Sequence, residues 1–102
     1  MTTAAITDNK AESRYETVVD GMMAVLEYDL DGQQITLRHT EVPVALGGRG
    51  IGGALAKFAL DDAKARGLTV VPTCPFVRPY VARHPEYLPI VRKDYAARIE
   101  GG

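Results

Sequence analysis

The segment Leu46-Gly47-Gly48-Arg49-Gly50-Ile51-Gly52-Gly53-Ala54-Leu55 decides the fold of this chain. Five glycines lie between positions 47 and 53, directly before an apolar pattern with helical spacing. Glycine has no Cβ, so such a loop brings backbone N–H groups close to a ligand. The unpaired N–H groups of the following helix would complete a site for an anion, most often a phosphate. The alternative interpretation is a glycine-rich turn that only connects a strand to a helix.

Upstream of this loop, the side chains alternate between apolar and polar over three segments. Residues 14–19, 22–30 and 34–42 each predict a strand, and Asp20-Gly21 and Asp31-Gly32 predict the hairpin turns between them. In the third strand, strict alternation would place Ile35, Leu37, His39 and Glu41 on one face. We therefore expect a three-stranded antiparallel meander.

Downstream of the loop, the spacing changes to that of a helix. Apolar residues follow Ile51 at helical spacing, and Gly67 is placed to end that helix. Residues 68–71 predict a short buried strand, parallel to the third one, which completes a β-α-β unit. A second helix is expected over residues 75–84, and residues 86–102 predict a further short strand or helix. The fold class is thus α/β with a mixed sheet: one domain over residues 14–98, with flexible tails at 1–13 and 99–102.

Composition narrows the classes of partner. The chain has 102 residues, 46% hydrophobic and 25% charged, and a formal net charge of −1. A chain without a basic excess is not expected to bind nucleic acid or an anionic membrane. No apolar run approaches a membrane span, and residues 1–13 lack the pattern of a signal peptide. A cytoplasmic protein is the expectation; the single cysteine fits it, and the histidines and cysteine lack the spacing of a metal site. The oligomeric state stays open.

The glycine spacing excludes two common nucleotide motifs. It is neither the G-x-G-x-x-G of a dinucleotide-binding unit nor a Walker loop, because no Gly-Lys-Ser/Thr follows. A strand ending in Val42-Pro43, then Gly-Arg-Gly-Ile-Gly and an Ala/Leu-rich helix, resembles the acetyl-coenzyme A loop of GNAT-type N-acetyltransferases, Arg/Gln-x-x-Gly-x-Gly/Ala. Gly47 stands at the Arg/Gln position and departs from that pattern. The segments 39–43, 72–77 and 80–87 are similar to the small single-domain members of this family, so the resemblance covers residues 16–87.

This resemblance implies a minimal GNAT-type fold that binds acetyl-coenzyme A. The loop N–H groups would hold the pyrophosphate, and the backbone near Val42 and Val44 would pair with the pantetheine arm. Cys74 would lie beside the coenzyme sulfur. The residues expected to bind the coenzyme are Val42, Val44, Gly48, Arg49, Gly50, Ile51, Gly52, Gly53 and Cys74.

Four residues, and one alternative to the first of them, are candidates for catalysis of acetyl transfer. Glu41, near the end of the third strand, is the first candidate for a general base, and neighbouring His39 is an alternative. Cys74 is a candidate nucleophile, although a cysteine is often only a small buried hydrophobe. By resemblance, a tyrosine of the second helix protonates the leaving thiolate, which favours Tyr80. His84 shares its helix face but is also placed to cap the helix.

Three functions remain open at this point. The first is an N-acetyltransferase that moves an acetyl group from acetyl-coenzyme A to an unidentified amine by direct attack in a ternary complex. The second is a module that binds or senses acetyl-coenzyme A without efficient turnover. The third is an interaction domain whose glycine loop binds nothing. Arg78 and Arg83 would add contacts to coenzyme phosphates in the first two.

Overall fold

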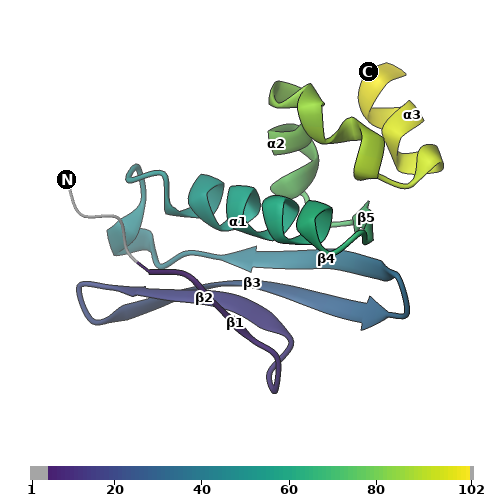
Figure 1. Ribbon diagram of the computed structural model, residues 1–102. Coiled ribbons are helices and arrows are strands. Elements are labelled where there is room, and N and C mark those ends of the chain that lie inside the picture. The colour runs from purple at the N-terminus through teal and green to yellow at the C-terminus, as the bar shows by residue number, and fades with distance from the viewer. Residues whose placement is uncertain (1–4, 102) are drawn as a thin grey trace.

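A single mixed sheet organises the chain. The computed structural model describes residues 5–101 and contains five strands in the order β1-β2-β3-β4-β5 (Figure 1). The strands are β1 (Thr7–Asn9), β2 (Arg14–Val19), β3 (Met22–Asp31), β4 (Gln34–Glu41) and β5 (Thr69–Pro72). The first four pair antiparallel with their neighbours, and β5 pairs parallel with β4. The predicted meander and β-α-β unit are both confirmed.

The two hairpin turns confirm the glycine signals in different ways. Asp20 and Gly21 both adopt positive φ, 52° and 75°, as a tight two-residue turn between right-twisted strands requires. In the second hairpin, Asp31 pairs with Gln34, so the turn residues are Gly32 and Gln33. Gly32 has φ 60° and is the first residue of this turn, whereas the Asp-Gly signal predicted glycine as the second residue.

The helices follow the loop. They are η1 (Val44–Leu46), α1 (Ile51–Ala65), α2 (Val77–Arg83), η2 (Pro85–Ile90) and α3 (Lys93–Gly101), where η marks a 3-10 helix. Gly67, at φ 69°, ends the first long helix as predicted. The open choice over residues 86–102 resolves to η2 and α3, joined at Val91, which makes an isolated parallel bridge with Val70. No helix within residues 5–101 combines the length and apolarity needed to cross a membrane.

All three α-helices lie on one side of the sheet. Figure 1 shows α1 across that side, with α2 and α3 beyond it towards β5. The apolar core fills the space between them, and its large fully buried side chains include Tyr15, Leu26, Ile35, Leu37, Leu55 and Leu60. The opposite side is uncovered in the described part of the chain. We call these the covered face and the open face of the sheet.

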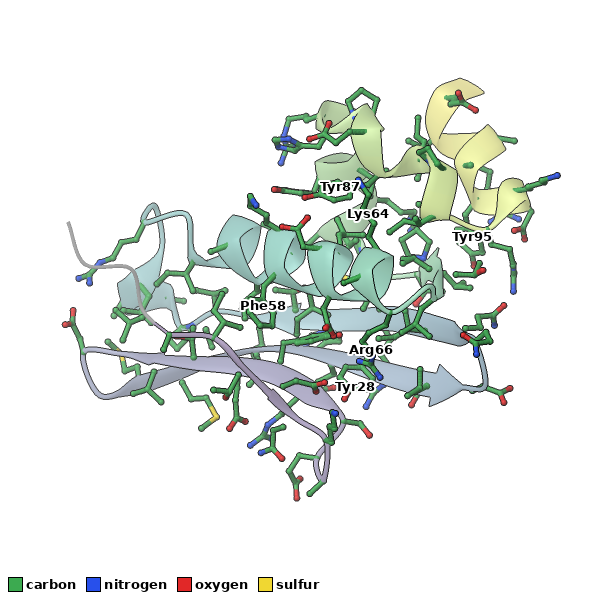
Figure 2. The ribbon with its side chains drawn as sticks, in the orientation of Figure 1. Tyr28, Phe58, Lys64, Arg66, Tyr87 and Tyr95 are labelled. Atoms are coloured by element: carbon green, nitrogen blue, oxygen red, sulfur yellow. The ribbon has the colours of Figure 1, made fainter. Side chains whose placement is uncertain are left out.

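Tyrosine–aspartate hydrogen bonds join the layers. Tyr15 in β2 donates to Asp62 of α1 at 2.8 Å, and Tyr87 in η2 donates to Asp61 of α1 at 2.6 Å. Figure 2 shows Phe58 on the sheet side of α1 and Tyr87 on its other side. Burial and the acceptor carboxylates raise the pKa values of Tyr15 and Tyr87, so both hydroxyls stay protonated and remain donors at neutral pH.

Both predicted tails are wrong where the structure describes them. Residues 7–9 form β1, because Tyr28 donates to Asp8 at 2.6 Å and Arg66 lies 3.6 Å from the same carboxylate. At the other end, residues 99–101 continue α3, and Ile99 packs against the core. Residues 1–4 and 102 lie outside the described residues.

Candidate functional site

A β-bulge changes the direction of the side chains at the end of β4. Glu27 of β3 pairs with His39, but the next residue, Tyr28, pairs with Leu37, so Arg38 is the extra residue. Beyond the bulge, Thr40 pairs with buried Leu26 and therefore belongs to the covered face.

His39 and Glu41 consequently lie on the open face. The prediction that they share a face with Ile35 and Leu37 is wrong. Strict alternation holds only while the ladder is regular, and one inserted residue inverts every side chain beyond it.

The bulge also marks the point where β4 and β5 part. Their parallel pairing ends at Leu37 and Pro72, and the Leu37 carbonyl accepts a hydrogen bond from the Cys74 N–H at 2.9 Å. No residue of β5 pairs with β4 beyond Leu37. We call the region where the backbones of residues 38–42 and residues 73–75 are no longer paired the β4–β5 gap. The side chains of Thr40 and Cys74 occupy it, with Oγ1 and Sγ 3.2 Å apart.

Cys74 follows β5 and lies at the gap, but it is only 1% exposed. Its sulfur accepts a hydrogen bond from the Phe76 N–H at 3.4 Å, in addition to its contact with Thr40. A thiol enclosed in this way is suited to contact a ligand within the gap. Nucleophilic attack would need the surrounding side chains to move first.

The glycine loop joins β4 to α1 and has the backbone of an anion site. Gly48 and Gly50 adopt φ values of 80° and 74°, which non-glycine residues rarely adopt. A Cβ at either position would meet no atom within 4 Å, so the surrounding space is open. Gly50 is the N-cap of α1, and no side chain caps its N–H groups. No acidic residue lies in the first turn of α1, so nothing there repels an anion.

Gly52 has a packing explanation. A Cβ built there would lie 2.8 Å from the tip of the Phe76 ring, so this ring rests directly on the helix backbone. A Cβ at Gly53 would lie 3.7 Å from the Tyr80 ring. Two aromatic rings thus cover one side of the first turn of α1. Phe76 was not among the predicted site residues, and its position before the second helix gave no separate signal.

Arg49 does not point freely into solvent. Its guanidinium donates to Asp20 Oδ2 at 2.7 Å, which links the glycine loop to the first hairpin turn. Both side chains are at least half exposed, so the pair contributes little to stability and can exchange for another anion. Asp20 is a neighbour of the site that local sequence could not indicate, because 29 positions separate the partners.

Val44 does not continue β4. It begins η1, its carbonyl accepts from the Gly47 N–H at 3.0 Å, and its side chain is exposed. Pairing of its backbone with the pantetheine arm stays a prediction. Val42 lies just beyond the end of β4 and packs partly against the core, so it remains beside the gap.

Glu41 and His39 form a pair on the open face. His39 Nε2 lies 3.3 Å from Glu41 Oε1, and the side chains are 52% and 73% exposed. A carboxylate beside an imidazole at this distance can pass a proton to solvent. The pair adjoins the gap, on the side opposite α1.

Tyr80 and His84 come together as predicted. Their rings stack with centroids 4.2 Å apart. Burial raises the pKa of Tyr80, so its hydroxyl is protonated at neutral pH, as an acid requires. The charges that act most on this hydroxyl belong to Lys57, Asp61, Glu86 and Arg83, and Glu41 is not among them.

The structure therefore separates the predicted catalytic residues. Glu41 lies on the open face, Cys74 lies inside the gap, and the Tyr80–His84 stack lies beside the start of α1. Only Cys74 lies in the gap itself. No group of three or more His, Cys, Asp or Glu residues within 5–101 could hold a metal ion.

Several known proteins resemble this chain in sequence or in fold. The family model described as GCN5-related N-acetyl-transferase matches residues 14–90. Protein NATD1 from Gallus gallus and from Homo sapiens are each 46% identical over 63 residues, 61% of this chain. The matched segment spans 57% and 56% of those two relatives. A solution structure of a GCN5-like protein from Staphylococcus aureus aligns with TM-score 0.69, at 24% identity, over 90% of this chain and 91% of that one.

Proposed function

Because the chain belongs to the GCN5-related N-acetyltransferase family, we propose that it transfers an acetyl group from acetyl-coenzyme A to an amine. One observation carries this proposal: the glycine loop, with its two left-handed glycines and the uncapped start of α1, lies at the end of the strand that borders the β4–β5 gap. Consecutive segments would thus supply a pyrophosphate site and an unpaired strand edge for an extended arm.

The loop fits the pyrophosphate of the coenzyme. The N–H groups of Ile51, Gly52 and Gly53 open α1 and have no acceptor within the helix. The positive end of the helix dipole favours negative charge at the same place. Arg49 adds a guanidinium, provided that a phosphate takes the place of Asp20.

The residues of the gap position the acetyl group. Beyond Leu37, the β4 edge that faces β5 lacks strand partners, so an extended pantetheine arm can hydrogen-bond to it. Thr40 and Cys74 would line the inner end of this arm, and the thioester carbonyl would lie level with the bulge. In this arrangement Cys74 is a neighbour of the sulfur.

Transfer then needs one bond formed and one broken. The amine nitrogen bonds to the acetyl carbon, the carbon–sulfur bond breaks, and coenzyme A leaves as the thiol. Glu41 accepts the ammonium proton, directly or through His39, on the open face. Tyr80, which is held in the protonated form, donates its proton to the departing thiolate on the covered side, and the second proton that the nitrogen loses as the amide forms restores the Tyr80 hydroxyl through solvent. The acceptor amine approaches from the open face and the coenzyme from the covered face.

Binding is tested by thermal melting with saturating acetyl-coenzyme A. A ligand at about a hundred times its dissociation constant stabilises a fold by roughly 2.7 kcal/mol, on the order of 10 °C for a domain of this size. Gly50→Val should abolish this shift. Gly32→Val is the matched control, because Gly32 also has positive φ and open space but lies in the second hairpin. A shift retained in Gly50→Val would refute the loop assignment.

Turnover separates an enzyme from a binding module. A specific observation favours the binding module: no helix covers the open face within the described residues, so no wall there encloses an acceptor. The test measures release of coenzyme A thiol across a panel of primary amines. Amine-dependent release that falls in Glu41→Gln supports transfer. Coenzyme binding with no amine-dependent release would support the module instead.

A further inference from the structure

A cleft on the far side of α2 lies apart from the site described above. It has a volume of about 420 Å³, which is within the usual range for pockets that take small molecules. Helices α2 and α3 form its two walls. The residues that line it are Pro75, Arg78, Pro79, Ala82, Arg98 and Ile99.

The cleft faces away from α1. Its α2 residues occupy the helix face opposite Val77, Tyr80 and Val81, which are buried towards α1. The glycine loop and the aromatic rings on it are therefore on the other side of α2. The two arginines that were expected at the coenzyme phosphates therefore lie in different surroundings. Arg78 lines the cleft, whereas the charge of Arg83 acts on the Tyr80 hydroxyl.

The two arginines of the cleft, like Arg83, have no carboxylate partner among the described residues. Within residues 5–101, Arg78 and Arg98 form no ion pair, and no acidic residue lines the cleft. The arginines that do form ion pairs are Arg14, Arg38, Arg49, Arg66 and Arg92. One apolar-walled cavity is thus lined by two arginines that have no carboxylate partner among the described residues.

Arg98 is held in position by its neighbour. Its guanidinium lies 5.0 Å from the centre of the Tyr95 ring, within the range of a cation–π contact, and Tyr95 lies at the start of α3 (Figure 2). The α3 wall is itself anchored, because the Arg92 N–H donates to the Val70 carbonyl at 2.9 Å. The second cation is therefore presented from a wall that is tied to the sheet.

We propose that the cleft between α2 and α3 binds a small organic anion, with its negative group between Arg78 and Arg98 and an apolar body against Pro79 and Ile99. A guanidinium donates two parallel hydrogen bonds to a carboxylate or phosphate, so a pair of them favours such a group over a neutral one. Pro75 and Ala82 extend the apolar wall beside Pro79 and Ile99. The site is independent of the proposed acetyl transfer and would exist in a chain that binds no coenzyme.

The test is a nuclear magnetic resonance titration of the ¹⁵N-labelled chain with phenylacetate. We expect saturable amide shifts confined to residues 78, 80–82 and 98–99, since Pro79 has no N–H. Phenylacetamide lacks the charge and acetate lacks the apolar body, so each should bind at least roughly tenfold more weakly, the loss expected from one charged hydrogen bond or a comparable apolar contact. Arg78→Gln and Arg98→Gln should each weaken phenylacetate by a similar factor.

Arg83→Gln is the matched control. It removes an arginine from the same helix that does not line the cleft, so binding should be unchanged. Unaltered resonances elsewhere establish that each variant is folded. Equal binding of phenylacetamide, an equal loss in Arg83→Gln, or absence of saturation at millimolar phenylacetate would each overturn the proposal. Displacement of phenylacetate by acetyl-coenzyme A would overturn it too, since the cleft would then belong to the coenzyme site.

Discussion

The covered and open faces of the sheet are built from the same strands but are stabilised differently. On the covered face, Tyr15, Leu26 and Leu37 are fully buried against α1. On the open face, the neighbouring positions carry ion pairs such as Arg14–Glu16 and Arg38–Glu27, at 2.7 and 2.9 Å. Burial stabilises the first face and contributes little to the second. A residue that moves from the covered face to the open face therefore loses its packing role and becomes accessible to solvent.

The largest expected effect is on the covered face. Leu37→Ala would leave a cavity at the last residue of β4 that pairs with β5 and should lower the free energy of unfolding by about 2–5 kcal/mol. Thr36→Ala, one position away on the open face, should cost less than about 1 kcal/mol. Urea denaturation measures both. Equal losses would mean that the two faces contribute alike, contrary to their burial.

Deletion of Arg38 should make the end of β4 regular without exchanging its faces. His39 then follows Leu37 in strict alternation and still pairs with Glu27 on the open face, and Thr40 stays on the covered face. The stabilisation by saturating acetyl-coenzyme A, roughly 2.7 kcal/mol for the parent chain, should therefore be kept. Arg38→Ser retains the bulge and removes only the guanidinium, so it should keep the thermal shift. Loss of the shift in both variants would assign the effect to charge.

A smaller effect is expected from the hydrogen bond between η2 and α1. Tyr87→Phe removes the donor to Asp61 and should cost about 1–2 kcal/mol. Burial alone would raise the pKa of Asp61, but the hydrogen bonds from Lys57 and Tyr87 outweigh it and hold this pKa below its usual value. Loss of one donor should raise it, as carboxyl ¹³C resonances would show. An unchanged pKa would contradict the bond.

The smallest effect is a titration on the open face. The Arg14 hydrogen bond lowers the pKa of Glu16 below its ordinary value of 4.5. A lowered folded-state pKa stabilises the fold above the unfolded-state value, and this contribution is lost as the pH falls through the folded-state value. Arg14→Gln should move the pKa of Glu16 upward towards 4.5. The same carboxyl titration detects it, and no upward shift would show that the pair does not persist in solution.

Local patterns predicted the elements of the fold. Alternation with Asp-Gly turns gave β2, β3 and β4 almost residue by residue, and the glycine loop gave α1. The face of Glu41 could not be predicted, because the sequence Leu37-Arg38-His39-Thr40-Glu41 is compatible with a bulged strand and with a regular one. The two arrangements place Glu41 on opposite faces. The strand β1 was missed because Thr7–Asn9 is polar. Its order depends on Tyr28 and Arg66, which are distant in sequence.

The site was predicted only in part for the same reason. Backbone features, the glycine loop and the position of Cys74, follow from local sequence. The contacts of Thr40 with Cys74 and of Phe76 with Gly52 depend on how β4, β5 and α2 meet. The separation of Glu41 from Tyr80 likewise depends on which side of the sheet each element occupies.

The consecutive aspartates of α1 have a mechanical consequence. Asp61 and Asp62 point about 100° apart around the helix, and each accepts from a tyrosine in a different layer, Tyr87 on one side and Tyr15 on the other. Any rotation of α1 about its axis that shortens one bond lengthens the other. The rotational phase of the helix is therefore locked near its carboxyl end, roughly 15 Å from Ile51. The two tyrosine hydrogen bonds therefore also set the direction of the first N–H groups of α1, which lie three turns away, next to the glycine loop.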